Sequence, residues 1–197
     1  AFHKSIAFAM GHSDATYEEG LKAIEAGAVS ITHTGNAMRL FHQHQPALFG
    51  VAMAEDVRCE MIADGLHLHP DTVRMYMKVK GGKKLLAISD SISAAGMPDG
   101  NYMLGINPVV VKNGDALLRD KNVRAGSTLT LDRAFRNIMA FSGESMAHCV
   151  PPMGPNQAEM LGFGKTYGSL SKGYVADFNV VDEKGNVEAT FIEGKRV

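Results

Sequence analysis

The sequence contains no tryptophan, only two cysteines and no excess of either charge. Cys59 and Cys149 form neither a CxxC pair nor a disulfide framework, which is typical of proteins in a reducing compartment. The 20 basic residues are balanced by 21 acidic ones, for a formal net charge of -1. Because no basic run could follow a phosphate backbone, we expect neither nucleic acid nor an anionic membrane surface as a partner.

Long hydrophobic runs are also missing. No apolar segment approaches the roughly 20 residues of a membrane-spanning helix, and the opening AFHKSIAFAM lacks the layout of a signal peptide. Together with the cysteine usage, this predicts a cytoplasmic protein. Position 1 is not methionine and a strand-like segment starts almost at once, so we expect the chain to be a piece of a longer protein.

The composition that is present suits a globular α/β protein. Apolar residues make up 45% of the 197 residues, enough to bury a core in one domain or slightly more. In the first half, short apolar strands alternate with helices, which indicates a parallel sheet. Thr16 and Glu19 are spaced as a capping box at the first helix. We expect strands over residues 5–10, 28–32, 57–63 and 84–89, and helices over residues 14–26 and 70–79.

Polar residues follow each of these strands: His12, then His33, then Asp64 with His67, then Asp90. In a β/α barrel the carboxyl ends of the strands converge on one face, where the chemistry takes place. Any one of these histidines alone is most simply a structural residue. Four polar strand ends in succession instead predict a single site built from distant parts of the chain.

The second half departs from this alternation. Asn113-Gly114 between two apolar runs predicts a hairpin within residues 101–119. Helices are expected over residues 131–141, 145–150 and 156–162, and two final strands are expected to be joined by a turn at 183–186. These segments give about five barrel-type strands, whereas a closed barrel needs eight and about 250 residues. We therefore favour a fragment over an open sheet as the explanation.

Six motifs carry a resemblance: GHSDATYEE, THTGNAM, IADGLHLHP, ISDSISAAGMPDG, AGSTLT and GYVADFNVVD. In order and spacing they resemble the second half of the N-acetylglucosamine-6-phosphate deacetylases, a family of the amidohydrolase superfamily. The resemblance covers nearly the whole chain. It implies that residues 1–163 are the C-terminal part of a metal-dependent (β/α)8 TIM-type barrel, and that residues 164–197 are strands of a small β-sandwich.

The activity implied by the resemblance is removal of the N-acetyl group of N-acetylglucosamine 6-phosphate, a step of amino-sugar catabolism. His12 and His33 match the family's metal-binding histidines. Neutral imidazoles on adjacent strand ends can share one Zn²⁺ or Fe²⁺. The resemblance implies one or two divalent metal ions per full-length subunit, and it places a third ligand, a glutamate, in the first half of the barrel. Asp90 matches the catalytic aspartate, which takes a proton from water and gives it to the leaving amine.

Substrate contacts follow from the same resemblance. Asn36 and Ala37 match a loop that contacts the phosphate, partly through backbone N–H groups, and His67 matches a substrate-contacting histidine. Met97 is expected to line the sugar site. Asp64 is expected to serve the turn or to support a neighbour rather than to catalyse. The family's homodimers, in which a loop of one subunit reaches the phosphate of the other, imply a second copy of the chain as a partner.

Two residues depart from the family pattern. His44 stands where the family usually has a phosphate-binding arginine, and histidine is a poorer clamp because it lacks the bidentate fork. Arg124 stands where leucine commonly lies near the acetyl group, and Arg39 and Arg124 can supply compensating positive charge. These departures leave open an amidohydrolase acting on an unphosphorylated N-acetyl amino sugar or another amide. The absence of the glutamate ligand and the early start of the chain leave open an inactive sugar-phosphate-binding or structural fragment.

Overall fold

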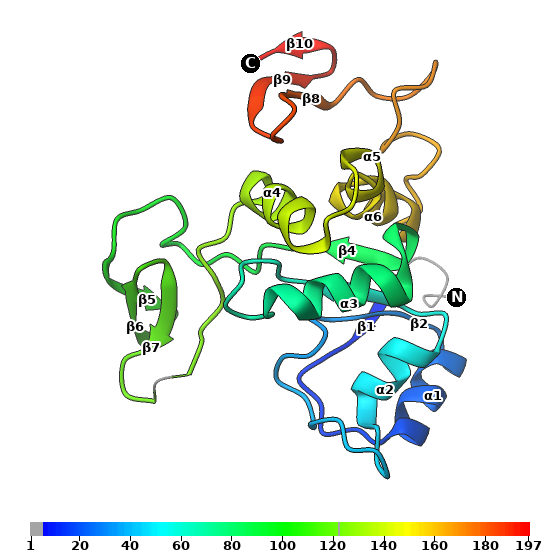
Figure 1. The fold of residues 1–197 in the computed structure, drawn as a ribbon, viewed down its shortest axis with the longest axis vertical. Coiled ribbons are helices and arrows are strands. Elements are labelled where there is room, and N and C mark those ends of the chain that lie inside the picture. The colour runs from blue at the N-terminus through cyan, green and yellow to red at the C-terminus, as the bar shows by residue number, and fades with distance from the viewer. Residues whose placement is uncertain (1–5, 122) are drawn as a thin grey trace.

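The computed structural model describes residues 6–121 and 123–197 (Figure 1). Its centre is a parallel sheet of four strands in chain order, β1 (Phe8–Met10), β2 (Ala28–Ile31), β3 (Arg58–Met61) and β4 (Leu85–Ala87). All four expected strands are present, each shorter than predicted, and residue 5 lies outside the described residues. An isolated parallel bridge joins Ser91, in the loop after β4, to Ser127. Within the described residues the sheet is open rather than closed into a barrel.

Local capping fixes where two of the helices begin. In α1 (Tyr17–Glu25) the Thr16 hydroxyl accepts from the Glu19 N–H at 3.2 Å, and the Glu19 carboxylate accepts from the Thr16 N–H at 2.8 Å. The predicted capping box is confirmed, and it starts the helix three residues later than expected. Helix α3 (Pro70–Lys80) begins on a proline and ends at Gly81.

Helix α2 (Ala47–Ala54) was not predicted. Its sequence, ALFGVAMA, is apolar throughout and so has no helical periodicity to recognise. The segment is helical because it is buried in the core, where Leu48, Val51 and Ala52 are fully inaccessible. The same core is packed by Cys59 and Met61 of β3, by α3 and by α4 (Leu131–Ser142).

The residues after β4 form a separate antiparallel sheet of three strands, β5 (Gly100–Leu104), β6 (Asn107–Lys112) and β7 (Asp115–Leu118). The predicted Asn113-Gly114 turn joins β6 to β7, with φ of 51° and 76°. Asp99 holds this turn by accepting the N–H groups of Asn113 and Gly114. The expected hairpin is thus part of a three-stranded sheet, which lies to one side of the central sheet (Figure 1).

The last third consists of short helices followed by a third sheet. Helices α5 (Met146–Cys149) and α6 (Pro155–Met160) occupy the predicted positions, with two 3-10 turns, η2 (Gly82–Lys84) and η3 (Pro151–Met153), beside them. Strands β8 (Phe178–Val181) and β9 (Val187–Ile192) are joined by the predicted turn, and a short β10 (Lys195–Arg196) adds to them. This sheet lies next to α4 (Figure 1), where Gly185 packs against Phe135. No helix in the described part of the chain is both long and apolar enough to cross a membrane.

Candidate functional site

Four of the predicted site residues share an unusual backbone conformation, Ala37 and the three at the strand ends. His12, His33 and Asp90 follow β1, β2 and β4, and their φ values are 45°, 29° and 49°. Residues other than glycine seldom adopt this left-handed region, which costs about 1–3 kcal/mol each and is concentrated at functional sites. Together with the polar side chains that these residues carry, the strain supports the carboxyl end of the sheet as the candidate site.

The side chains of His12 and His33 meet. Their Nε2 atoms lie 2.8 Å apart, and the ring centroids are separated by 4.6 Å with the planes at 73°. His33 is buried, with 6% of its surface exposed, and its Nδ1 is a buried atom without a hydrogen-bond partner. Two imidazole nitrogens that face each other in this way suit a shared divalent metal. No group of three or more histidine, cysteine or acidic side chains suited to a metal occurs in the described residues, so a metal at these two rings would need further ligands from elsewhere.

Glu60, which the sequence analysis did not select, holds the His33 segment in place. Its side chain accepts the His33 N–H at 3.3 Å, and its backbone carbonyl accepts the Thr34 N–H at 2.9 Å. Burial raises the pKa of Glu60, the His33 N–H opposes this, and the nearby Asp90 carboxylate adds to the rise. The available signal was strand alternation, because Glu60 lies between buried Cys59 and Met61 and so faces the other side of β3.

Asp90 is held through its backbone. Its carbonyl accepts the Ser127 N–H at 2.7 Å, and the Ser127 hydroxyl donates to the carbonyl of Ser89. A Cβ on Gly126 would lie 2.8 Å from the Asp90 carbonyl oxygen, so the loop fits only with glycine there. The Asp90 side chain is exposed. The ISDS and AGST motifs therefore act together to present this carboxylate.

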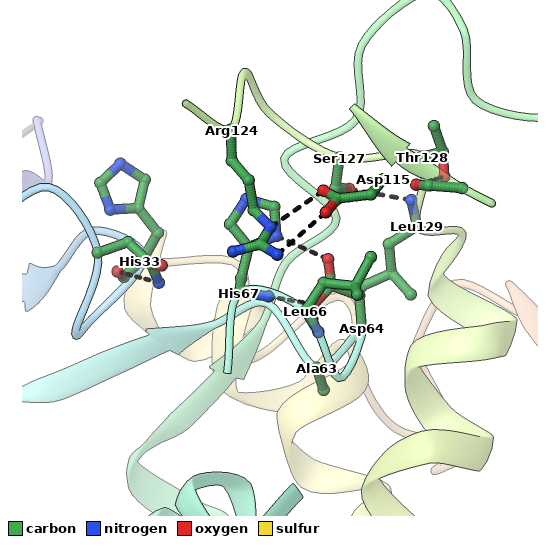
Figure 2. A network of polar contacts seen from close by, with 12 residues as sticks. His33, Ala63, Asp64, Leu66, His67, Asp115, Arg124, Ser127, Thr128 and Leu129 are labelled. Atoms are coloured by element: carbon green, nitrogen blue, oxygen red, sulfur yellow. Dashed lines mark hydrogen bonds and ion pairs between the residues drawn. The ribbon is translucent and has the colours of Figure 1, made fainter. Parts of the chain in front are cut away.

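Asp64 and His67 form a compact pair in the loop after β3 (Figure 2). Asp64 Oδ2 lies 2.6 Å from His67 Nδ1, while Oδ1 accepts the N–H groups of Leu66 at 2.8 Å and His67 at 2.7 Å. Burial alone would raise the pKa of Asp64, but hydrogen bonds from the His67 ring and from the two N–H groups outweigh it and lower that pKa.

The loop after His33 and the loop that carries His67 line one cavity of about 470 Å³. Gly35 and Met38, on either side of Asn36 and Ala37, are part of its wall. Asn36 is fastened to the His33 carbonyl by its N–H at 3.0 Å and its Nδ2 at 3.1 Å. Ala37 is exposed and has a φ of 48°. The lining of this cavity, as far as the chain is described, does not include His12, His33 or Asp90.

Of the remaining predicted residues, Arg39 lines the same 470 Å³ cavity as His67, and His44, Met97 and Arg124 are not part of its lining as described. Arg124 forms a two-bond pair with Asp115 at 3.0 Å for each bond, and Arg39 forms one with Asp14 at 2.9 and 2.7 Å. Both arginines suggested as compensating charges are thus already paired with carboxylates. His44 is exposed and lines a different cavity of about 300 Å³, and Met97 is 57% exposed in the loop before β5.

Comparison with known proteins places these features in context. The profile of the amidohydrolase family matches residues 1–197. Among curated relatives, the N-acetylglucosamine-6-phosphate deacetylase of Bacillus subtilis is 36% identical over 192 residues, which cover 97% of this chain and 48% of the relative. The enzyme of the same name from Lysinibacillus sphaericus is 36% identical over 187 residues, covering 94% and 48%. The chain therefore spans about half the length of the curated relatives it matches.

Solved structures give the same result for the fold. The N-acetylglucosamine-6-phosphate deacetylase of Thermotoga maritima superposes with a TM-score of 0.94 at 35% identity, covering 99% of this chain and 53% of that one. A variant of the Mycobacterium smegmatis deacetylase in complex with N-acetyl-D-glucosamine-6-phosphate superposes with a TM-score of 0.89 at 34% identity, covering 97% and 51%. These similarities confirm the predicted family resemblance and an amidohydrolase fold.

Proposed function

The chain belongs to the amidohydrolase family, and on that premise we propose that it is part of a metal-dependent deacetylase that hydrolyses N-acetylglucosamine 6-phosphate to glucosamine 6-phosphate and acetate. The observation that carries the proposal is the meeting of His12 and His33, whose Nε2 atoms lie 2.8 Å apart at adjacent strand ends. The relatives that match over nearly the whole chain carry the name of this activity.

His12 and His33 would hold a divalent metal, zinc or iron, with the remaining ligands supplied by residues outside this chain. When bound, such an ion polarises the amide carbonyl and lowers the pKa of a water molecule. The backbone of His33 is fixed on both sides, by Glu60 and by Asn36, so its imidazole is held in place before any ion binds. A metal-binding histidine in a strained backbone conformation has to be held in place by its neighbours, and these hydrogen bonds do so.

Asp90 would take the proton from the attacking water and return it to the leaving amine nitrogen. A carboxylate can serve both steps in turn, because it is the base in the first and, once protonated, the acid in the second. The exposed side chain of Asp90 is free to reach a substrate above the sheet, while Ser127 and Gly126 fix its backbone.

Substrate binding is proposed for the residues that the family resemblance selects. Backbone groups of Asn36 and Ala37 would contact the phosphate, and His67 would contact the sugar. Met97 would line the sugar site, and His44 and Arg124 would act at its edges. The guanidinium group of Arg124 is paired with the Asp115 carboxylate, and that of Arg39 with the Asp14 carboxylate. A phosphate would therefore find little unpaired positive charge on these two arginines. This observation keeps the unphosphorylated N-acetyl amino sugar as the second candidate substrate.

The architecture beyond the described residues is also part of the proposal. A closed (β/α)8 barrel with residues 1–163 as its C-terminal portion, and residues 164–197 as strands of a β-sandwich, would accommodate the open parallel sheet and the separate sheet β8–β10. A homodimer in the cytoplasm is the expected state of the complete protein.

The test is acetate release by the full-length protein that contains this chain, with N-acetylglucosamine 6-phosphate and N-acetylglucosamine compared at equal concentration. We expect strong preference for the phosphate ester. A preference for the unphosphorylated sugar would favour the second candidate, and no acetate from either with metal bound would contradict deacetylation.

The Asp90→Asn variant separates chemistry from binding in the same assay. We expect turnover to fall by several orders of magnitude with metal content unchanged, since only the proton carrier is lost. Asp56→Asn is the matched control, because Asp56 is an exposed residue paired with Lys84 at the other end of β3. Near-normal turnover in Asp90→Asn would remove Asp90 from the mechanism.

A further inference from the structure

We propose that Asp64 is a positioning residue that fixes the tautomer of His67, so that the neutral imidazole presents Nε2 as a hydrogen-bond acceptor to a sugar hydroxyl. The inference rests on the proposed function for the identity of the ligand. The Asp64–His67 geometry on which it stands does not depend on that function.

The geometry leaves the Asp64 carboxylate little freedom. It receives three hydrogen bonds from within its own loop: two N–H groups on Oδ1 and the His67 ring on Oδ2 (Figure 2). Only 3% of the Asp64 side chain and 8% of the His67 side chain are exposed. A buried carboxylate with all its near partners in one short loop cannot rotate away without losing every bond at once.

The partners dictate the protonation pattern of the ring. The two backbone N–H groups are donors, and their bonds favour the ionised form of Asp64, in agreement with its lowered pKa. An ionised carboxylate can only accept hydrogen bonds, so the proton between Asp64 and His67 belongs to Nδ1. In the neutral ring the other nitrogen, Nε2, then carries a lone pair.

The location of Nε2 indicates what it meets. Within the described residues Nε2 of His67 has no hydrogen-bond partner, and His67 is part of the wall of the 470 Å³ cavity beside Gly35 and Met38. The group that it accepts from therefore lies outside the described residues, and the place of His67 in the cavity wall favours a bound ligand. A sugar offers several hydroxyl donors, and a site built to bond one discriminates against analogues that lack it.

Asp64→Asn tests the inference because it changes the proton while conserving the shape. The asparagine Oδ1 can still accept both N–H groups, but its Nδ2 would donate to His67 Nδ1 and force the proton onto Nε2. Asp71→Asn is the matched control. Asp71 also lies beside a histidine ring of the same loop, with 3.5 Å between its Oδ2 and His69 Nδ1, but both side chains are largely exposed.

The first measurement is the His67 tautomer, read from two-bond ¹⁵N–¹H NMR spectra of the full-length protein at about pH 9, where an ordinary histidine is neutral. Comparison with His67→Gln assigns the signal. We expect the Nδ1–H form in the wild type, the Nε2–H form in Asp64→Asn and no change in Asp71→Asn. An Nε2–H wild type, or an unswitched Asp64→Asn protein, would overturn the proposal.

The second measurement is the kinetics with N-acetylglucosamine 6-phosphate. We expect kcat/KM to fall about 10–100-fold in Asp64→Asn, the range typical of residues that orient a functional histidine, and to stay unchanged in Asp71→Asn. A tautomer switch without loss of kcat/KM would refute the positioning role. Because the spectra need no substrate, a wild type that released no acetate would refute the proposed function and leave the spectra to decide on Asp64.

Discussion

The contact between Tyr76 and the loop of Thr34 and Gly35 permits a quantitative test of how the candidate site is supported. Tyr76 lies in the middle of α3, is fully buried, and donates its hydroxyl to the Thr34 carbonyl at 2.8 Å. A Cβ built on Gly35 would lie 2.8 Å from the same hydroxyl oxygen, and Gly35 has a φ of 92°. The phenol thus fixes the segment that follows His33.

The two single substitutions have separate costs. Tyr76→Phe leaves the fully buried Thr34 carbonyl without its donor, which costs about 1–3 kcal/mol. Gly35→Ala places a methyl group in a left-handed conformation, a cost of about 1–2 kcal/mol, and adds the collision with the hydroxyl. In the double variant that oxygen is gone, so the collision disappears. We expect the double variant to be more stable than the sum of the two losses predicts, by about 1 kcal/mol.

The assay is urea unfolding of the four proteins, followed by circular dichroism, with the midpoint and the slope fitted separately. Tyr17→Phe is the matched control. Its hydroxyl also donates, to Glu55 at 2.6 Å, but the residue is only half-buried, so its loss should cost less than that of Tyr76→Phe. Additivity within about 0.5 kcal/mol would show that the phenol does not restrain the loop, and the reasoning would fail.

Two further predictions follow from Glu60 and Asp64. Glu60→Ala should weaken metal binding by the full-length protein about 10–100-fold, because the His33 N–H loses its acceptor. Glu60→Gln keeps an acceptor oxygen, so in a metal titration it should bind nearly normally. Equal metal affinities of the two variants would contradict a role of Glu60 in holding His33. The lowered pKa of Asp64 means that its ionised form stabilises the fold above the unfolded pKa of about 3.9, and that this contribution is lost as the pH falls through the folded pKa. Thermal unfolding below about pH 4 should therefore show a smaller acid-dependent loss in Asp64→Asn than in the wild type, and identical pH profiles would contradict it.

Much of the local structure could be predicted because it depends on residues close together in the chain. The capping box of Thr16 and Glu19 and the Asn113-Gly114 turn both appear as expected. The same is true of the alternation of strands and helices in the first half. Helix α2 could not be predicted, because its uniform apolar sequence carries no period and becomes helical through burial.

The candidate site was predicted only in part, because only its local features can be recognised from residues close together in the chain. The position of a polar residue after a strand is visible in the sequence, so His12, His33 and Asp90 could be selected as candidates. Their roles stay predictions, but the meeting of the two histidines is now an observed geometry. Glu60 was missed because its partner, the His33 N–H, lies 27 residues away and no motif spacing announces it.

The sequence by itself therefore determined the family, the order of the elements and the residue types at the strand ends. The family was indicated by the resemblance of six motifs, whereas the order of the elements and the residue types at the strand ends follow from backbone preferences and side-chain patterns within a few residues. Only the tertiary structure decided which of those groups meet: that His12 faces His33, and that Asp115 occupies the fork of Arg124. Such pairings depend on strand order, on the direction of each side chain and on which charges burial brings together. The spacing of residues along the chain does not reveal any of these three features.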